Sequence, residues 1–135
     1  MLAWSGASIA SIPLERFAAE AGRPLDQQLK AAIDYGVRHA AYEIISGKGA
    51  TYYGIGAAIA TLCRCILFDE RAVYTVCAVN RHAFGVDDVA LSLPHVIGRN
   101  GIISTLIPDL SDEELTSMHR SASVIETALA SLKPE

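Results

Sequence analysis

The stretch VALSLPHVIGRNGIISTLI (Val89 to Ile107) decides the fold, because it has the pattern of two strands joined by a tight turn. Val89 to Ile97 and Gly101 to Ile107 are rich in the β-branched and apolar residues that favour strands. The Asn-Gly pair within Gly98 to Gly101 favours a hairpin. Pro94 has no backbone N–H, which predicts that the first strand is bulged or lies at an edge.

A third strand and two helices are predicted upstream of this hairpin. Arg71 to Val79 (RAVYTVCAV) is dominated by β-branched and aromatic residues, and Asn80 to Asp88 is the loop that follows. Leu25 to Ser46 carries apolar residues at spacings of three and four, which predicts a long amphipathic helix. Tyr52 to Phe68 is apolar nearly all round, which predicts a helix buried on most of its sides.

Helices are also predicted towards both ends of the chain. A short helix has Pro13 in its first turn and ends by Gly22. Ser111-Asp-Glu-Glu114 matches a capping box, and an apolar stripe follows from Leu115 to Leu132. The expected fold is α+β, with long helices packed on a small antiparallel sheet. No Rossmann domain is expected in this chain, because strands alternating with helices and a glycine fingerprint are absent.

Composition narrows the class of protein. With 135 residues the chain has the length of one domain, and its net charge of -4 gives no electrostatic reason to bind nucleic acid or an anionic membrane. The first ten residues lack an export signal, and Arg64 interrupts the most apolar stretch, so we expect a cytoplasmic protein. Hydrophobic residues make up 51% of the chain, which suggests that some apolar surface faces a partner.

Ionisable and metal-binding residues give only weak signals. The three cysteines (Cys63, Cys65, Cys77) are best interpreted as reduced, partly buried thiols, because no four-ligand zinc spacing is present. The four histidines (His39, His82, His95, His119) are scattered and are interpreted as ordinary surface or hydrogen-bonded residues. Gly54-Ile-Gly56 is not a phosphate loop, since Ile59 stands where the third glycine would be. We therefore expect no metal site.

Thr51 is the most informative candidate for a binding residue. It follows the glycine-punctuated segment Gly47-Lys48-Gly49 and precedes an apolar helix, so its hydroxyl could contact a small polar substrate. From composition alone, N-capping of that helix is the preferred interpretation.

The segment RHAAYEIISGKGATYYGIGAAIATL (Arg38 to Leu62) resembles the long helix, turn and following helix of bacterial L-lactate dehydrogenases. The resemblance covers nearly the whole chain and identifies residues 1–135 as similar to the C-terminal, substrate-side domain of the lactate/malate dehydrogenase family. Further matching segments are DERAV from Asp69, GVDDV from Gly85, LPHVIGRNG from Leu93, and Ala3-Trp4-Ser5.

The resemblance implies a function and two site residues. It implies part of an NAD-dependent L-lactate dehydrogenase that interconverts L-lactate and pyruvate, as a homodimer or homotetramer. Thr51 matches the family threonine that contacts substrate, and Ile55 matches the isoleucine that packs near the nicotinamide. A neutral hydroxyl can hydrogen-bond a hydroxy or keto acid, so capping and substrate contact are compatible roles for Thr51.

The sequence departs from the family pattern at its front. It has no Gly-Glu-His-Gly-Asp-Ser motif, no Asp-x-x-Arg segment and no nucleotide-binding domain, so no catalytic residue is expected in this chain. We expect the isolated chain to be inactive and to need the missing N-terminal half, which would bind most of the NAD. Two alternatives remain open: a fragment of a related malate dehydrogenase, and a non-catalytic remnant that oligomerises or binds a partner.

Overall fold

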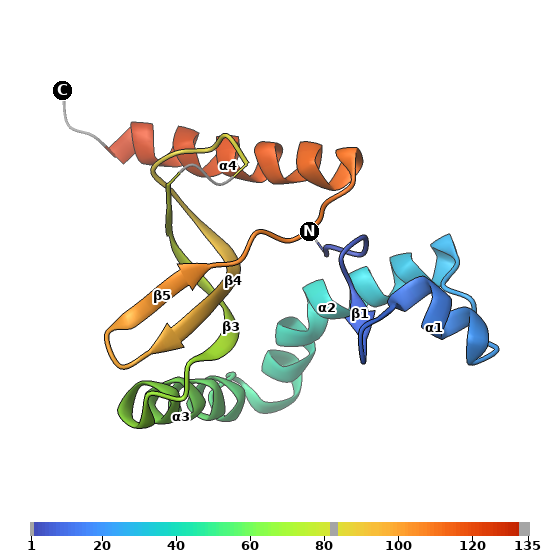
Figure 1. Ribbon diagram of the computed structural model, residues 1–135, viewed down its shortest axis with the longest axis horizontal. Coiled ribbons are helices and arrows are strands. Elements are labelled where there is room, and N and C mark those ends of the chain that lie inside the picture. Colours follow the sequence, from blue (N-terminus) through green and yellow to red (C-terminus); the bar gives the residue numbers. More distant parts are fainter. Residues whose placement is uncertain (1, 82–83, 133–135) are drawn as a thin grey trace. The chain divides into compact units, whose positions relative to one another are not determined.

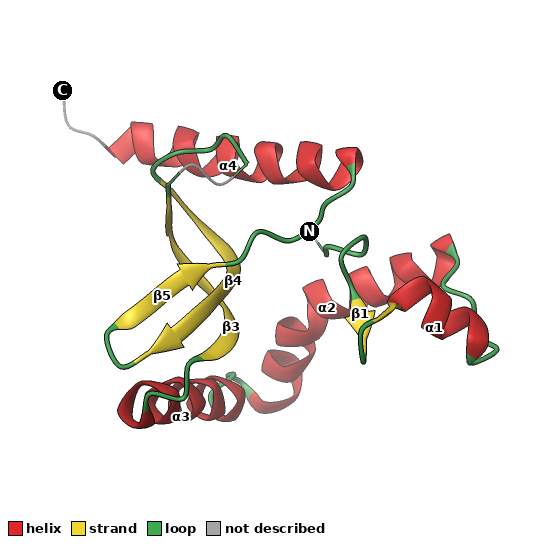
Figure 2. Cartoon of the chain, in the orientation of Figure 1, coloured by secondary structure: helices red, strands yellow, loops and turns green. Residues whose placement is uncertain are grey.

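The computed structural model describes residues 2–81 and 84–132, which form helices and antiparallel sheets (Figures 1 and 2). They divide into an N-terminal unit, residues 2–61, and a C-terminal unit from residue 62 onward. The elements are β1 (Ser8–Ile9), β2 (Ile12–Pro13), α1 (Leu14–Glu20), α2 (Gln27–Lys48), α3 (Tyr53–Phe68), β3 (Ala72–Asn80), β4 (Val89–Gly98), β5 (Gly101–Thr105) and α4 (Asp112–Leu132). The predicted α+β class is confirmed. No helix among the described residues is long and apolar enough to cross a membrane.

The N-terminal unit contains a short pairing that the sequence did not indicate. β1 pairs antiparallel with β2, two residues each, so Pro13 caps α1 instead of lying inside its first turn. Strands of two residues are too short to show an alternating pattern, which is why the prediction missed them. The long helix α2 is confirmed and begins after Asp26, whose side chain accepts a hydrogen bond from the backbone N–H of Leu29 at 2.7 Å.

A charged contact links three segments of the N-terminal unit. The Lys30 ammonium on α2 lies 2.8 Å from Glu15 Oε1 on α1 and 5.9 Å from the centre of the Trp4 ring. The Lys30 side chain is only 18% exposed, so this cation–π contact and ion pair are partly shielded from water. They hold the segment before β1 against both helices.

The C-terminal unit is built on a three-stranded antiparallel sheet in the order β3-β4-β5 (Figure 1). The predicted hairpin is confirmed: Gly98 pairs with Gly101, and Gly101 adopts a φ of 91°. Pro94 predicted that this strand is either bulged or an edge, and the edge alternative is wrong because β4 is the central strand. The predicted irregularity is present, as a register shift between Val96 and Ile97 in the pairing with β5.

Pro94 is tolerated in this central strand because of where β5 ends. The carbonyl of Pro94 accepts a hydrogen bond from Leu106 N at 2.8 Å, one residue past the end of β5 at Thr105. In an antiparallel strand, the N–H and C=O of one residue point towards the same neighbouring strand. The side of Pro94 that lacks an N–H therefore faces the residues just past the end of β5, and not β3. The β3–β4 ladder therefore stays continuous.

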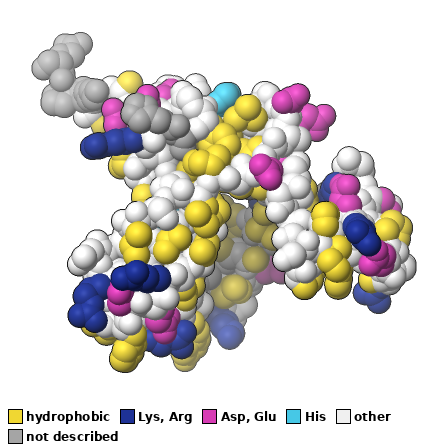
Figure 3. Space-filling view, viewed as in Figure 1, with side chains coloured by type: hydrophobic (Ala, Val, Ile, Leu, Met, Phe, Trp, Pro, Cys, Tyr) yellow, Lys and Arg dark blue, Asp and Glu magenta, His cyan; other side chains and the backbone are white. Residues whose placement is uncertain are grey.

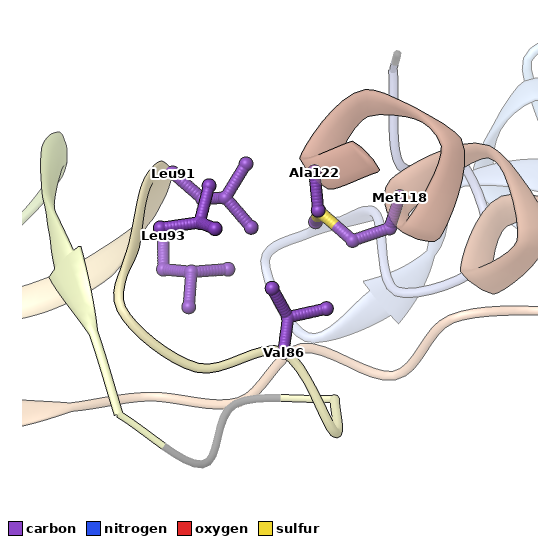
Figure 4. Close-up of a cluster of buried hydrophobic side chains, with 6 residues drawn as sticks. Val86, Leu91, Leu93, Met118 and Ala122 are labelled. Atoms are coloured by element: carbon purple, nitrogen blue, oxygen red, sulfur yellow. The ribbon is translucent and has the colours of Figure 1, made fainter. Parts of the chain in front are cut away.

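The core of the C-terminal unit lies between β4 and α4 (Figure 4). Alternate residues of β4 point to this side, and Leu91 and Leu93 are at most 6% exposed. Met118 and Ala122 of α4 pack against them, four residues apart and so on one face of the helix. Val86, from the loop before β4, also belongs to this cluster.

The capping box predicted at the start of α4 is confirmed. Ser111 N donates to Glu114 Oε2 at 2.9 Å, and Glu114 N donates to Ser111 Oγ at 3.3 Å. The apolar stripe of α4 is only partly buried, because Leu129 is 45% and Leu132 is 77% exposed. Ile125 still packs against the core, so only the last part of the stripe is largely uncovered by the described residues.

The prediction that the helix from Tyr52 to Phe68 is buried on most sides is wrong for this chain. Cys65 is the one buried residue of α3, and its thiol donates to the carbonyl of Ile97 at 3.1 Å. Ile59 is 56% and Leu67 is 70% exposed. The sequence indicated correctly that the helix is apolar all round, but the described residues cover only one side. Apolar side chains are accordingly visible on the molecular surface (Figure 3).

Asp69 connects the end of α3 to the hairpin of β4 and β5. Its Oδ1 accepts a hydrogen bond from Arg99 N at 2.9 Å, across 30 residues of sequence, and its Oδ2 lies 3.3 Å from Arg71 Nε. A Cβ on Gly98 would lie 2.6 Å from Asp69 Oδ1 and 2.7 Å from Ile103 Cδ1. The close approach of the two segments therefore requires glycine at position 98.

We expect Gly98→Ala to lower the free energy of unfolding by about 1 kcal/mol, at the low end of the cost of overpacking. Ile103 is 54% exposed and can rotate away, whereas Asp69 moves only by weakening its bond to Arg99. Urea denaturation followed by circular dichroism measures the loss. Gly36→Ala is the control, because a Cβ there meets nothing within 4 Å. Equal stability of both variants would contradict the steric argument.

Asp69 also predicts a pH dependence of stability. The hydrogen bond from Arg99 N, and secondarily the Arg71 guanidinium, lower the pKa of Asp69 in the folded chain. A lowered folded pKa stabilises the fold above pH about 4, and this contribution is lost as the pH falls through the folded pKa. Asp69→Asn keeps an acceptor for Arg99 N but removes the charge.

The Asp69→Asn variant should therefore lose less stability than the parent between about pH 4 and pH 2. Urea midpoints measured across that range test this expectation. Asp109→Asn, which changes an exposed carboxylate outside the strands and helices, should keep the slope of the parent. Parallel profiles for the parent and Asp69→Asn would show that the carboxylate contributes nothing through its charge.

Candidate functional site

The turn between α2 and α3 carries the candidate binding residue Thr51. Helix α2 ends at Lys48, and Gly49 caps it in the left-handed conformation with a φ of 78°. The N–H of Gly49 donates to the carbonyl of Ile45 at 2.7 Å. The chain therefore leaves the helix at Gly49, as the glycine punctuation predicted.

Thr51 is not the residue that caps α3. The helix begins at Tyr53, and Gly56 N donates to the carbonyl of Tyr52 at 2.9 Å, which puts Tyr52 in the N-cap position. The N-capping interpretation of Thr51 is therefore wrong. Thr51 is exposed, and its hydroxyl makes no hydrogen bond to any residue that the structure describes. The hydroxyl is free to bind something else.

Ile55 lies in the first turn of α3, four residues after Thr51. Its side chain is 59% exposed, so the start of this helix offers a neutral hydroxyl and an apolar side chain to solvent. The rings of Tyr52 and Tyr53 stand between them in sequence, tilted by 55° with centroids 4.7 Å apart. A hydroxyl of this kind donates and accepts hydrogen bonds but carries no charge. These residues can bind and orient a small molecule, and proton transfer needs another group.

Some charged and aromatic residues on α2 pair with one another, namely Asp34 with Arg38 and Tyr35 with His39. Arg38 Nε lies 2.6 Å from Asp34 Oδ2, and this hydrogen bond lowers the pKa of Asp34 and raises that of Arg38. The His39 ring stacks on Tyr35 at 3.9 Å, and its Nδ1 donates to the Tyr35 carbonyl at 2.8 Å. Among the described residues, neither Arg38 nor His39 makes a hydrogen bond, an ion pair or a ring contact with Thr51.

His95 and His119 each make a hydrogen-bonding contact within the C-terminal unit. His95 is 1% exposed in β4, with Nδ1 3.0 Å from Thr105 Oγ1 and with no recorded partner for Nε2. His119 Nε2 donates to the carbonyl of Phe84 at 2.7 Å and so ties α4 to the loop before β4. His82 lies outside the described residues. Within residues 2–81 and 84–132, no cluster of three metal-ligating side chains is present.

The three cysteines belong to the C-terminal unit, whereas Thr51 belongs to the N-terminal unit. Cys63 and Cys77 are exposed free thiols, whereas Cys65 is buried at the end of α3. The interpretation of partly buried thiols is therefore correct for one of the three. Cys65 fills space and donates a weak hydrogen bond, which is a structural role.

Sequence reasoning identified the glycine segment before Thr51 but not the particular residue that turns the chain. Gly47 lies inside α2, and Gly49 alone of this segment has a positive φ. A glycine directly after the last basic residue of a helix is a C-cap signal, and it could have identified Gly49.

Comparison with known proteins agrees with this architecture. Residues 1–134 match the family model of the lactate/malate dehydrogenase, alpha/beta C-terminal domain. The chain is 48% identical over 132 residues to the L-lactate dehydrogenase of Thermus aquaticus, covering 98% of this chain and 43% of that protein. It is 46% identical over 126 residues to the L-lactate dehydrogenase of Allorhizobium ampelinum, covering 93% of this chain and 41% of that protein.

A solved structure shows the same fold. The minor L-lactate dehydrogenase from Enterococcus mundtii, in a ligands-bound form, superposes with a TM-score of 0.88 at 29% sequence identity. The match covers 98% of this chain and 42% of that chain. The chain thus spans less than half the length of the proteins it matches. It belongs to the lactate/malate dehydrogenase family and corresponds to the α/β C-terminal domain of that family.

Proposed function

We propose that this chain is the substrate-side part of an NAD-dependent L-lactate dehydrogenase that interconverts L-lactate and pyruvate. The observation that carries the proposal is the similarity over nearly the whole chain to proteins named L-lactate dehydrogenase. Thr51 agrees with a substrate role, because its hydroxyl is exposed and makes no hydrogen bond to the described residues. Thr51 binds the substrate through that hydroxyl and leaves proton transfer to another residue.

The residues of this chain are suited to contact only the nicotinamide end of NAD. The described sheets contain only antiparallel pairs, so a parallel sheet with a phosphate-binding loop is missing from this part of the chain. The exposed apolar side chain of Ile55 fits the face of a nicotinamide ring. NAD supplies or accepts the hydride in this reaction. A nucleotide-binding half outside this sequence holds the rest of the cofactor, and the isolated chain is inactive.

The uncovered apolar residues support a larger assembly. Phe68 on α3 is 73% exposed and Leu132 on α4 is 77% exposed, which is unfavourable for a domain that works alone. In the proposed enzyme these two helices pack against the nucleotide-binding half or against a second subunit, as a homodimer or homotetramer in the cytoplasm. Burial of such side chains contributes most of the free energy that holds subunits together.

The proposal predicts activity in a chimera with the front part of the Thermus aquaticus enzyme, which is 48% identical over the matching region. The upstream residues of that enzyme, joined to this chain, should reduce pyruvate with NADH, measured by absorbance. Faster reduction of oxaloacetate would favour the related malate dehydrogenase. A folded chimera with no activity on either substrate would contradict the proposal and favour a non-catalytic remnant.

In the active chimera, Thr51→Val should raise the apparent KM for pyruvate about five- to tenfold, because it removes one hydrogen bond and keeps the side-chain shape. Thr61→Val is the matched control. The Thr61 hydroxyl bonds to the carbonyl of Ala57 within α3, so the same change there should leave the KM for pyruvate unaltered. An unchanged KM in Thr51→Val would remove Thr51 from the substrate site.

Ile55→Asn should raise the KM for NADH more than the KM for pyruvate, since it puts an amide where the proposal puts the nicotinamide ring. Initial rates measured at several NADH concentrations test this expectation. Val124→Asn on α4, which changes another exposed apolar residue, is the control. Equal effects on both Michaelis constants would argue against a cofactor contact at Ile55.

A further inference from the structure

We infer that Gly49 is a positioning residue for substrate binding, because its left-handed backbone sets where the Thr51 hydroxyl lies. This inference rests on the proposed role of Thr51. Gly49 would touch neither substrate nor cofactor and would act only through the path of the chain. Both residues belong to the N-terminal unit, and two peptide bonds separate them.

The turn is constrained at both ends by backbone hydrogen bonds. On one side, Gly49 N donates to the carbonyl of Ile45 at 2.7 Å and closes the last turn of α2. On the other side, Gly56 N donates to the carbonyl of Tyr52 at 2.9 Å and opens α3. Only Ala50 and Thr51 lie between these two anchored points. A change of direction at Gly49 is therefore passed directly to Thr51.

The requirement at Gly49 is conformational and not a lack of space. Its φ of 78° lies in the region that L residues rarely adopt, whereas a Cβ built at this position meets nothing within 4 Å. An alanine therefore fits sterically but favours a negative φ, which would continue α2 and redirect Ala50 and Thr51. Asparagine tolerates the left-handed conformation better than other non-glycine residues, so it should restore the turn.

The Thr51 hydroxyl is free because of this turn. If the chain continued as a helix past Lys48, the Thr51 side chain would lie on that helix, where hydroxyls commonly bond to the carbonyl four residues before. Such bonds are present elsewhere in the chain, from Thr61 to Ala57 and from Thr116 to Asp112. The left-handed residue ends α2 before Thr51 and keeps its hydroxyl available to a ligand.

The experiment is a double-mutant cycle in the active chimera. Gly49→Ala should raise the KM for pyruvate about fivefold, which is the factor expected for the loss of one hydrogen bond. The KM for NADH should change less. In the Thr51→Val background the same change should have no further effect on the KM for pyruvate, because the hydroxyl that it displaces is gone. Gly49→Asn should restore most of the parent value.

Gly47→Ala is the matched control. Gly47 lies inside α2, has no positive φ, and a Cβ there meets nothing within 4 Å, so this variant should keep the parent KM. The inference is overturned if Gly49→Ala leaves the KM for pyruvate unchanged. It is also overturned if Gly49→Ala raises that KM by the same factor in the parent and in the Thr51→Val background. A KM for pyruvate in Gly49→Asn that is as high as in Gly49→Ala would overturn it as well.

These outcomes separate the inference from the proposed function. An inactive parent chimera, or an unchanged KM in Thr51→Val, removes the proposed role of Thr51 and the inference with it. An active parent with a raised KM in Thr51→Val and a parent-like KM in Gly49→Ala removes the inference alone. Far-ultraviolet circular dichroism of each variant identifies any loss of helix that would affect both substrates.

Discussion

Burial of apolar side chains is the constraint on which the rest of this structure depends, and the chain satisfies it unevenly. Leu91 and Leu93 of β4 are covered by Met118 and Ala122 of α4, which gives the C-terminal unit its core. Helix α3 is apolar all round but buries only Cys65. A helix of this composition is stable in water mainly when other surfaces cover it. The exposed apolar surface therefore supports the proposal that this domain works inside a larger enzyme.

The candidate site follows from the way in which α2 ends and α3 begins. Gly49 ends α2 and Tyr52 is the N-cap of α3. Thr51 therefore lies between the two helices, and its hydroxyl caps neither of them. A neutral hydroxyl can hold and orient a hydroxy or keto acid, while hydride and proton transfer need groups from elsewhere. The proposed function rests on this division, and the relatives that the chain matches are more than twice as long as the chain.

Several features could be predicted because neighbouring residues determine them. The hairpin at Asn100-Gly101 and the capping box from Ser111 to Glu114 both formed as expected. The strand order could not be predicted in the same way. Pro94 predicted a bulged or an edge strand. The strand is irregular, but it is the central one, because the side of Pro94 that lacks an N–H faces the end of β5. The role of Thr51 as a cap was also predicted wrongly, since α3 begins at Tyr53, one residue later than the predicted start at Tyr52.

The sequence by itself determined the α+β class, the long helices, the three strands of the larger sheet and the family. Helical periodicity, turn residues and a resemblance along the whole chain can all be read from the order of the residues. Only the tertiary structure decided which apolar faces stay uncovered and which distant groups meet. The bond from Arg99 N to Asp69 joins residues 30 positions apart, and the free state of the Thr51 hydroxyl depends on a left-handed φ at Gly49. Such features arise from the path of the backbone through space. The residue types limit which backbone conformations are allowed, but they do not select one of them.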